Sequence, residues 1–347
     1  MKIVDLFSGA GGLSLGFEAA GFEPVLAVDF WEKAIITYNH NHKFKVGIHK
    51  DIKEIDEGFL REKLKENFES IDGVIGGPPC QGFSIAGQRI IDDERNELYR
   101  DYFKIVAILK PKFFLIENVT GLLSFANGAV KDDIEKRSKE LGYSLRVKVL
   151  NAAQHGVPQY RKRAFFVAIR NDFNIDLFDF PRPENAEITI FEALSDLPYL
   201  ENDEDPTKYR NNPVNDYQRK LRGNETVVKN HVLANHTKMI KDIISQVKEG
   251  QGLSSLPDEH KAGRNYSSLL RRMDRNKPSF TIDTGHRTYF HFAENRIPSV
   301  REAARLQSFP DYFEVMGGRQ DQYRQIGNAV PPILAERIAN QIKKVIG

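Results

Sequence analysis

The chain has 347 residues, of which 40% are hydrophobic and 28% are charged, and it contains a single cysteine. This composition predicts a globular α/β protein with one large domain and an insert, or with two domains. A single cysteine excludes an internal disulfide and a cysteine zinc site, and the lack of a long apolar run excludes a membrane-spanning helix. Basic and acidic side chains number 50 and 48, a net charge of +2, so any nucleic-acid surface requires locally segregated charge.

The N-terminal segment Lys2 to Phe7 has the pattern of a buried strand, followed by a glycine turn, Ser8 to Gly12, that opens a helix ending at Gly21. A strand that starts this early leaves no room for a signal peptide, which predicts a cytoplasmic protein. Ser14 stands where a dinucleotide-binding fingerprint requires its third glycine. The turn therefore predicts close approach of a ligand or a backbone, without naming the ligand.

Two further strands end in acidic residues. Pro24 to Val28 leads to Asp29 and Phe30, and Phe44 to Ile48 leads to Asp51 and Ile52. An acid at a strand end can hold ribose hydroxyls, and an aromatic ring can line an adenine. Together with the glycine turn, these strand ends predict a nucleoside pocket; they do not predict a phosphate cradle, because no glycine-lysine-serine/threonine loop is present.

The single cysteine, Cys80, lies in the segment Gly76 to Ser84, just past the apolar strand residues Gly73 to Ile75. Most lone cysteines are small buried hydrophobic residues. Here Pro79 fixes the preceding backbone in a loop at the carboxyl end of a strand, where open α/β sheets bind ligands. This position favours a nucleophile. We expect the polar loop from Gln81 to Asn96 to act as a lid.

The middle of the chain continues the α/β pattern. A charged surface helix is expected at Asp56 to Phe68, and further helices at Leu98 to Leu109 and Ala129 to Leu141. The apolar strand Lys112 to Ile116 ends at Glu117, a candidate general acid beside the cysteine loop. Two more strands, Leu145 to Leu150 and Ala164 to Ile169, bracket a basic loop that contains Arg161 and Arg163 and suits an anion or a polar base edge.

From Pro181 to Pro298 the sequence is polar and irregular, with short helices expected at Ile190 to Leu194 and Met239 to Val247. Its basic stretch, Lys261 to Lys277, is interleaved with aromatic residues and predicts a partner that carries phosphates. A capping box at Ser299 starts a helix, Gln325 to Pro332 predicts a tight turn, and Ile333 to Ile346 predicts an amphipathic helix. We therefore divide the chain into a catalytic and cofactor-binding domain (1–180), a recognition domain (181–298) and a return to the first domain (299–347).

Six motifs occur in a fixed order: Asp5 to Gly12, Pro78-Pro79-Cys80-Gln81, Glu117-Asn118-Val119, Gln159-x-Arg161-x-Arg163, Arg301 to Pro310, and Gly327 to Pro332. This set resembles the DNA (cytosine-5) methyltransferases of bacterial restriction–modification systems. The resemblance covers both ends of the chain, and the polar middle corresponds to the target recognition domain of that family.

The resemblance implies a doubly wound, mostly parallel sheet with a smaller irregular recognition domain, and S-adenosylmethionine as the methyl donor, which leaves as S-adenosylhomocysteine; no metal is implied. The residues that it assigns to the cofactor are Phe7, Gly9, Ala10, Gly11, Gly12, Asp29, Phe30, Asp51, Ile52, Pro79, Leu98, Asn328 and Val330. Those that it assigns to catalysis are Cys80, Glu117, Arg161 and Arg163, and the candidate DNA contacts are Ser84, Arg271, Arg272 and Arg275.

The implied reaction is methylation of carbon 5 of a cytosine flipped out of duplex DNA, through a covalent adduct of Cys80 with carbon 6. The partners expected from the resemblance are double-stranded DNA and a separate cognate restriction endonuclease, with no membrane. The protein is expected to be a monomer in the bacterial cytoplasm, associated with the nucleoid.

Three alternatives remain. A transfer RNA cytosine-5 methyltransferase would share these motifs, although the basic polar middle favours DNA. A non-catalytic DNA-binding regulator on the same scaffold would not need a thiol at Cys80. A nicotinamide-dependent oxidoreductase is disfavoured by Ser14.

Overall fold

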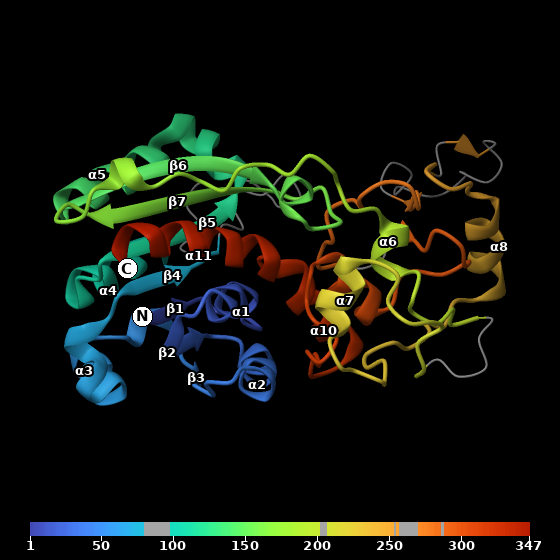
Figure 1. Ribbon diagram of the computed structural model, residues 1–347, viewed down its shortest axis with the longest axis horizontal. Coiled ribbons are helices and arrows are strands. Elements are labelled where there is room, and N and C mark those ends of the chain that lie inside the picture. The colour runs from blue at the N-terminus through green and yellow to red at the C-terminus, as the bar shows by residue number, and fades with distance from the viewer. Residues whose placement is uncertain (80–97, 202–206, 253–254, 257–269, 286–287) are drawn as a thin grey trace. The chain divides into compact units, whose positions relative to one another are not determined.

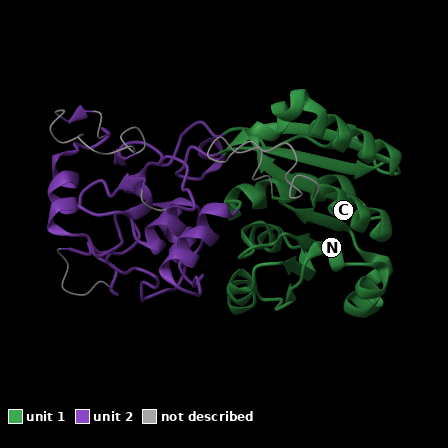
Figure 2. Ribbon diagram, turned by 180° about the vertical axis from the view of Figure 1, so that it is seen from behind, with its two compact units in different colours: residues 1–151, 162–183, 330–347 green, residues 152–161, 184–329 purple. Residues whose placement is uncertain are grey.

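The computed structural model describes residues 1–79, 98–201, 207–252, 255–256, 270–285 and 288–347, and the chain divides into two compact units (Figures 1 and 2). Unit 1 consists of residues 1–151, 162–183 and 330–347, and unit 2 consists of residues 152–161 and 184–329. The expected change of character at Pro181 lies close to a boundary between the units. Residues 299–329 differ from the expectation, because they group with unit 2 and not with the catalytic layer.

Unit 1 is built on a seven-stranded sheet with the order β3-β2-β1-β4-β5-β7-β6. Its strands are β1 (Lys2–Leu6), β2 (Glu23–Asp29), β3 (Gly47–His49), β4 (Gly73–Gly76), β5 (Phe113–Val119), β6 (Tyr143–Asn151) and β7 (Lys162–Arg170). The first five strands in the chain pair in parallel, and β7 runs antiparallel to both of its neighbours. The expected fold class, a doubly wound and mostly parallel α/β sheet, is confirmed.

The helices of unit 1 are α1 (Gly12–Ala19), α2 (Glu32–Asn41), α3 (Glu57–Leu64), α4 (Leu98–Leu109), α5 (Ala129–Glu140) and α11 (Pro332–Ile346). Apolar side chains of α3, α4 and α5 form one buried cluster with alternate residues of the strands, such as Val74 and Phe114. On α1, Phe17 stacks on Phe113, which points to the opposite face of the sheet from Phe114. Gly16 of α1 allows close packing on α11, since a Cβ there would lie 2.4 Å from Ala335 Cβ.

Two elements of unit 1 differ from the sequence expectation. The expected helix from Asp56 to Phe68 ends at Leu64, because Lys65 has a positive φ of 50°, and the segment Lys65–Ser70 continues as a 3-10 helix. The helix α2 was not expected at all. In the described part of the chain, no helix has the length and apolarity that crossing a membrane requires.

Unit 2 contains short helices joined by long irregular segments. They are α6 (Ile190–Leu194), α7 (Asp216–Arg222), α8 (Lys238–Gln246), α9 (Val300–Leu306) and α10 (Arg319–Asn328), with a two-residue pair of strands, β8 (Arg271–Arg272) and β9 (Tyr289–Phe290). The expected capping box at Ser299 is confirmed. The expected tight turn at Gln325 is wrong in its first part, because α10 extends to Asn328.

Buried ion pairs explain why α9 belongs to unit 2. Arg305 of α9 is fully buried and bonds both Asp196 (3.0 Å from Nη1 to Oδ1) and Asp311 (2.5 Å from Nε to Oδ1). Breaking a buried pair of this kind costs about 3–5 kcal/mol, because it leaves an uncompensated charge. These pairs link α9 to segments on both sides of it within the same unit.

Candidate active site

The glycine turn after β1 has the backbone that a ligand-binding turn requires. Phe7, Gly9 and Gly11 have positive φ values of 59°, 55° and 89°, which strain a side-chain-bearing residue such as Phe7. A Cβ at Gly9 would meet no atom within 4 Å, so this side of the turn is open. The Gly9 amide donates to Asp29 Oδ2 at 2.8 Å, and the Trp31 amide donates to Oδ1 of the same carboxylate at 2.8 Å. Asp29 therefore fastens the turn to the end of β2.

Side chains around this turn fit a nucleoside. Phe30 is 64% exposed next to Asp29, and Asp51 is exposed at the end of the neighbouring strand segment, where it accepts a hydrogen bond from the Lys53 amide. An ionised carboxylate has about four acceptor sites, so Asp29 can accept ribose hydroxyls in addition to its two amides. An open glycine turn, a carboxylate and an exposed ring together suit the adenosyl group of S-adenosylmethionine.

The other cofactor candidates range from residues of the core cluster of unit 1 to Asn328, which is exposed in unit 2. Phe7 and Leu98 pack against the core cluster of unit 1, and Ile52 is buried in it. Pro79 is partly buried and Val330 is buried, both in unit 1, whereas Asn328 is the last residue of α10 in unit 2.

Behind the turn, the carboxyl group of Asp5 is fully buried. Ser14 Oγ donates to Asp5 Oδ2 at 2.6 Å, and the Tyr38 hydroxyl donates to Ser14 Oγ at 3.1 Å. Burial raises the pKa of Asp5 from 3.8 to about 7. Because folding raises this pKa, the contribution of Asp5 to the free energy of unfolding falls as the pH rises from about 3.8 to about 7.

The residues just before Cys80 lie against the end of β5. The Asn118 side-chain amide donates to the Pro78 carbonyl oxygen at 3.0 Å, and a Cβ at Gly77 would lie only 3.1 Å from Glu117 Oε2. The chain therefore enters the cysteine loop beside the Glu117 carboxylate. Cys80 itself, Ser84 and the expected lid from Gln81 to Asn96 lie outside the described residues.

Glu117 forms an ion pair with Arg163. Arg163 Nε lies 3.1 Å from Glu117 Oε1, and the two side chains are 15% and 10% exposed. The pair follows from register, because β5 and β7 are antiparallel and Arg163 stands opposite Val119, two residues from Glu117 on the same face. Burial lowers the pKa of the Arg163 guanidinium, and the Glu117 carboxylate opposes this shift. Of the two arginines proposed for catalysis, Arg163 thus lies beside Glu117.

Arg161 has a different environment from the one expected. It is 1% exposed in unit 2, and its guanidinium donates to the carbonyl oxygens of Ile282 (3.3 Å) and Gly327 (3.0 Å). Glycine at position 327 allows its segment to approach the segment of Asp283, since a Cβ there would lie 2.5 Å from the Asp283 backbone. A guanidinium committed to two backbone carbonyls does not fit a contact with the base or with the cysteine. We assign Arg161 a structural role.

The three arginines expected to contact DNA also differ in their environments. Arg272 is 5% exposed and donates to four backbone carbonyls and to the Asn295 side chain, so a base contact by Arg272 is not supported. Arg275 pairs with Glu249 at 2.9 Å and lies over the Phe292 ring. Arg271 is exposed on β8, and its guanidinium lies over the Phe280 ring. Arg271 therefore remains the strongest of the three candidates.

This contrast gives a matched pair of variants. Arg272→Ala is expected to lower the melting temperature of unit 2, because it leaves several buried carbonyl oxygens without a hydrogen-bond donor. Each such unsatisfied carbonyl lowers the free energy of unfolding by about 1–3 kcal/mol. Arg271→Ala is expected to leave the melting temperature within about 2 °C and to weaken binding to cognate duplex DNA by about 1–3 kcal/mol. Differential scanning calorimetry and fluorescence anisotropy measure the two effects. The opposite pattern, with Arg272→Ala stable but defective in DNA binding, would contradict these assignments.

Within the described residues, His291, Glu294 and Glu302 have the spacing of a metal site. Arg296 lies between the two carboxylates, with Nη2 on Glu302 Oε1 at 2.8 Å and Nε on Glu294 Oε2 at 3.0 Å. His291 Nδ1 accepts hydrogen bonds from two backbone amides, and burial lowers the pKa of His291 to about 3. The Arg296 guanidinium already bonds both carboxylates, and we interpret this cluster as a buried ion-pair network.

Sequence reasoning did not assign a role to Asn118, although it follows Glu117 at the same strand end. Its place in the Glu117-Asn118-Val119 motif was the available signal, and the structure shows that its side chain holds the Pro78 carbonyl oxygen before the cysteine loop. His42, whose ring bonds Glu18 and the Ala10 carbonyl oxygen, carried no such signal, because these partners lie on other elements.

Comparison with known proteins identifies the family of the chain. The family described as C-5 cytosine-specific DNA methylase matches residues 1–344. The chain is 38% identical to the type II methyltransferase M.DdeI of Desulfomicrobium norvegicum, covering 99% of this chain and 88% of that protein. It is 35% identical to the type II methyltransferase M1.HphI of Haemophilus parahaemolyticus, with 99% and 87% covered.

Solved structures show the same fold. A DNA modification methyltransferase encoded within an E. coli prophage superposes with a TM-score of 0.83 at 27% identity, covering 99% of both chains. The Entamoeba histolytica methyltransferase EhMeth superposes with a TM-score of 0.65 at 16% identity, covering 99% of this chain and 98% of that one, and supports the fold alone.

Proposed function

The chain belongs to the C-5 cytosine-specific DNA methylase family, and we propose that Cys80, Glu117 and Arg163 carry the reaction of this DNA (cytosine-5-)-methyltransferase. Enzymes of this family use S-adenosylmethionine. The observation that supports these roles is the Glu117–Arg163 ion pair beside Gly77 and Pro78, where the chain enters the cysteine loop.

Each proposed role follows from the chemistry of cytosine. Carbon 5 is a poor nucleophile, and addition of the Cys80 thiolate to carbon 6 turns the ring into an enamine that is a good one. Glu117 supplies the proton or hydrogen bond that ring nitrogen 3 needs as its electron density rises. Bound S-adenosylmethionine supplies an electrophilic methyl group. Carbon 5 then gives its proton to solvent water, and the electron pair of that bond re-forms the double bond to carbon 6, which expels the thiolate and restores Cys80.

Arg163 has two proposed tasks. Its guanidinium orients the Glu117 carboxylate, and its positive charge favours the thiolate over the thiol, whose ordinary pKa is about 8.5. The target base must leave the duplex to reach these groups, at a cost of about a few kcal/mol.

The cofactor is proposed to bind at the glycine turn. Gly9 leaves room for the ligand, Asp29 accepts the ribose hydroxyls, and Phe30 and Asp51 flank the adenine. The remaining cofactor residues are proposed to have the roles that the family resemblance implies; they are Phe7, Ala10, Gly11, Gly12, Ile52, Pro79, Leu98, Asn328 and Val330. The product is S-adenosylhomocysteine.

Asp29→Ala is expected to raise the Michaelis constant for S-adenosylmethionine about tenfold to a hundredfold, since one charge-assisted contact contributes roughly 1.5–3 kcal/mol. The Michaelis constant for DNA should change much less. Isothermal titration calorimetry with S-adenosylhomocysteine measures the same loss without turnover. If Asp29→Ala bound S-adenosylhomocysteine as tightly as the wild type does, the cofactor site would not include Asp29.

We also propose a biological role, that of a type II modification enzyme which protects DNA from a cognate endonuclease in the cytoplasm. The polar segment 181–298 is proposed to read the target sequence. The curated relatives named above are type II methyltransferases, which favours DNA over transfer RNA as the substrate. Assaying one preparation on duplex DNA and on transfer RNA separates these substrates, and activity restricted to transfer RNA would overturn the proposal.

A further inference from the structure

A hydrogen-bonded pair, Glu18 of α1 and His42 just after α2, lies directly behind the glycine turn. We propose that this pair is a positioning element that holds the turn in its cofactor-binding conformation. The inference rests on the proposed cofactor site at the turn and adds residues that do not themselves contact the ligand.

His42 connects two segments through its ring nitrogens. Nδ1 is hydrogen-bonded to Glu18 Oε1, and Nε2 lies 3.2 Å from the carbonyl oxygen of Ala10, in the middle of the turn. The His42 side chain is fully buried, and that of Glu18 is 13% exposed. The ring therefore joins α1 to the turn from a buried position.

Both bonds can form only if the pair holds two protons. The Ala10 carbonyl oxygen only accepts, so Nε2 must carry a proton. A second proton must lie between Nδ1 and Glu18 Oε1, on either atom. A neutral imidazole beside an ionised carboxylate has one proton too few and loses one of the two bonds. The bond to Glu18 thus fixes the orientation in which the His42 ring presents Nε2 to the turn.

Steric contacts reinforce the hydrogen bonds. A Cβ at Gly11 would lie 2.0 Å from His42 Nε2, so the ring packs directly on the backbone of Gly11, whose positive φ requires glycine. The His42 ring also stacks on Tyr38, with centroids 3.9 Å apart and planes 11° apart. Tyr38 in turn bonds Ser14, which bonds the buried Asp5 under the same turn.

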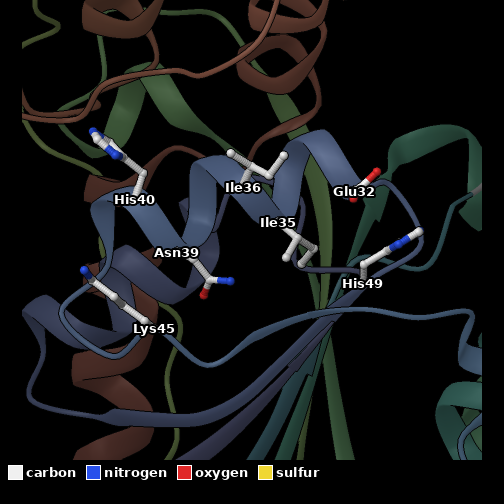
Figure 3. A pocket seen from close by; sticks show the side chains of 7 residues that line it. All are labelled: Glu32, Ile35, Ile36, Asn39, His40, Lys45 and His49. Atoms are coloured by element: carbon white, nitrogen blue, oxygen red, sulfur yellow. The ribbon is translucent and has the colours of Figure 1, made fainter.

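The two faces of α2 have separate environments. Tyr38 faces inward, whereas Glu32, Ile36 and His40 line a hollow of about 620 Å³ on the outer side, bordered by Lys45 and His49 (Figure 3). His40 thus provides a control two residues from His42 on the same stretch of chain.

The test measures cofactor affinity directly. His42→Phe keeps a ring on Gly11 and Tyr38 but removes both hydrogen bonds. We expect it to weaken S-adenosylhomocysteine binding by about tenfold in calorimetry without DNA, and to raise the Michaelis constant for S-adenosylmethionine equally. The turnover number at saturating cofactor should stay within about twofold, since ground-state and transition-state binding are lost together.

Two variants of Glu18 sharpen the test. Glu18→Leu should weaken binding by about threefold to tenfold. Glu18→Gln should restore nearly wild-type affinity, because its amide can donate to Nδ1 while Nε2 still donates to Ala10. His40→Phe is the control and should leave affinity unchanged.

The outcomes are separable. Wild-type affinity in folded His42→Phe would overturn the inference, and if that variant does not fold, wild-type affinity in Glu18→Leu would overturn it. If Asp29→Ala also leaves cofactor affinity unchanged, the proposed cofactor site fails as well; if only Asp29→Ala is defective, the site stands and the positioning role fails.

Discussion

Replacing Cys80 by serine is expected to lower methyl transfer to duplex DNA by at least about 10⁴-fold, because removal of an enzyme nucleophile leaves only the contribution of binding and orientation. A serine hydroxyl is far less acidic than a thiol and does not add to carbon 6 near neutral pH. DNA affinity should remain close to that of the wild type, since the substitution changes one atom of a side chain.

A mechanism-based probe measures this prediction directly. Duplex DNA with 5-fluorocytosine at the target position should form a stable adduct with the wild-type enzyme and S-adenosylmethionine, because fluorine cannot leave as a proton does. Peptide mapping should locate the adduct at Cys80, and Cys80→Ser should form none. Wild-type turnover in Cys80→Ser would refute the assignment of the nucleophile.

Glu117→Gln is expected to lower the turnover number by about 10²–10⁴-fold, the range of general acid–base contributions. The amide keeps the size of the side chain and can still accept a hydrogen bond from Arg163 Nε, but it has no acidic proton to give to ring nitrogen 3. Single-turnover kinetics at saturating cofactor and DNA isolates this step.

The exposed pair of Lys136 and Glu140 on α5 offers a control. Glu140→Gln removes one carboxylate from the same unit at a surface site, and methyl transfer should not change. Equal turnover in Glu117→Gln and in the wild type would mean that Glu117 is structural and that another group assists cytosine.

The ends of β2 and β4 could be predicted because each apolar run is short and leads at once to an acid or to a glycine-proline segment, whereas β5 continues past its predicted end at Ile116 to Val119. Parallel strands bring their carboxyl ends to one edge, so Asp29 and the glycine turn were expected to be neighbours, and the hydrogen bond from the Gly9 amide to Asp29 agrees with this. The Glu117–Arg163 pair depends on the register of β5 and β7, which the sequence does not display.

The roles of Arg161 and Arg272 could not be predicted for a physical reason. A basic side chain near other basic residues indicates an anion site only if it is exposed, and burial depends on partners far along the chain. Arg161 bonds carbonyls 121 and 166 residues away. The helices α2 and α10 are rich in polar residues, and their packing is set by tertiary contacts such as the stacking of Tyr38 on His42.

The most direct test of the account is a map of 5-methylcytosine after expression of the chain in a host that lacks cytosine methylation. We predict that genomic DNA acquires 5-methylcytosine at nearly every occurrence of one short sequence, and that the Cys80→Ser variant leaves the DNA unmethylated. Genomic DNA that stays unmethylated at carbon 5 of cytosine, despite folded protein in the cell, would contradict the account.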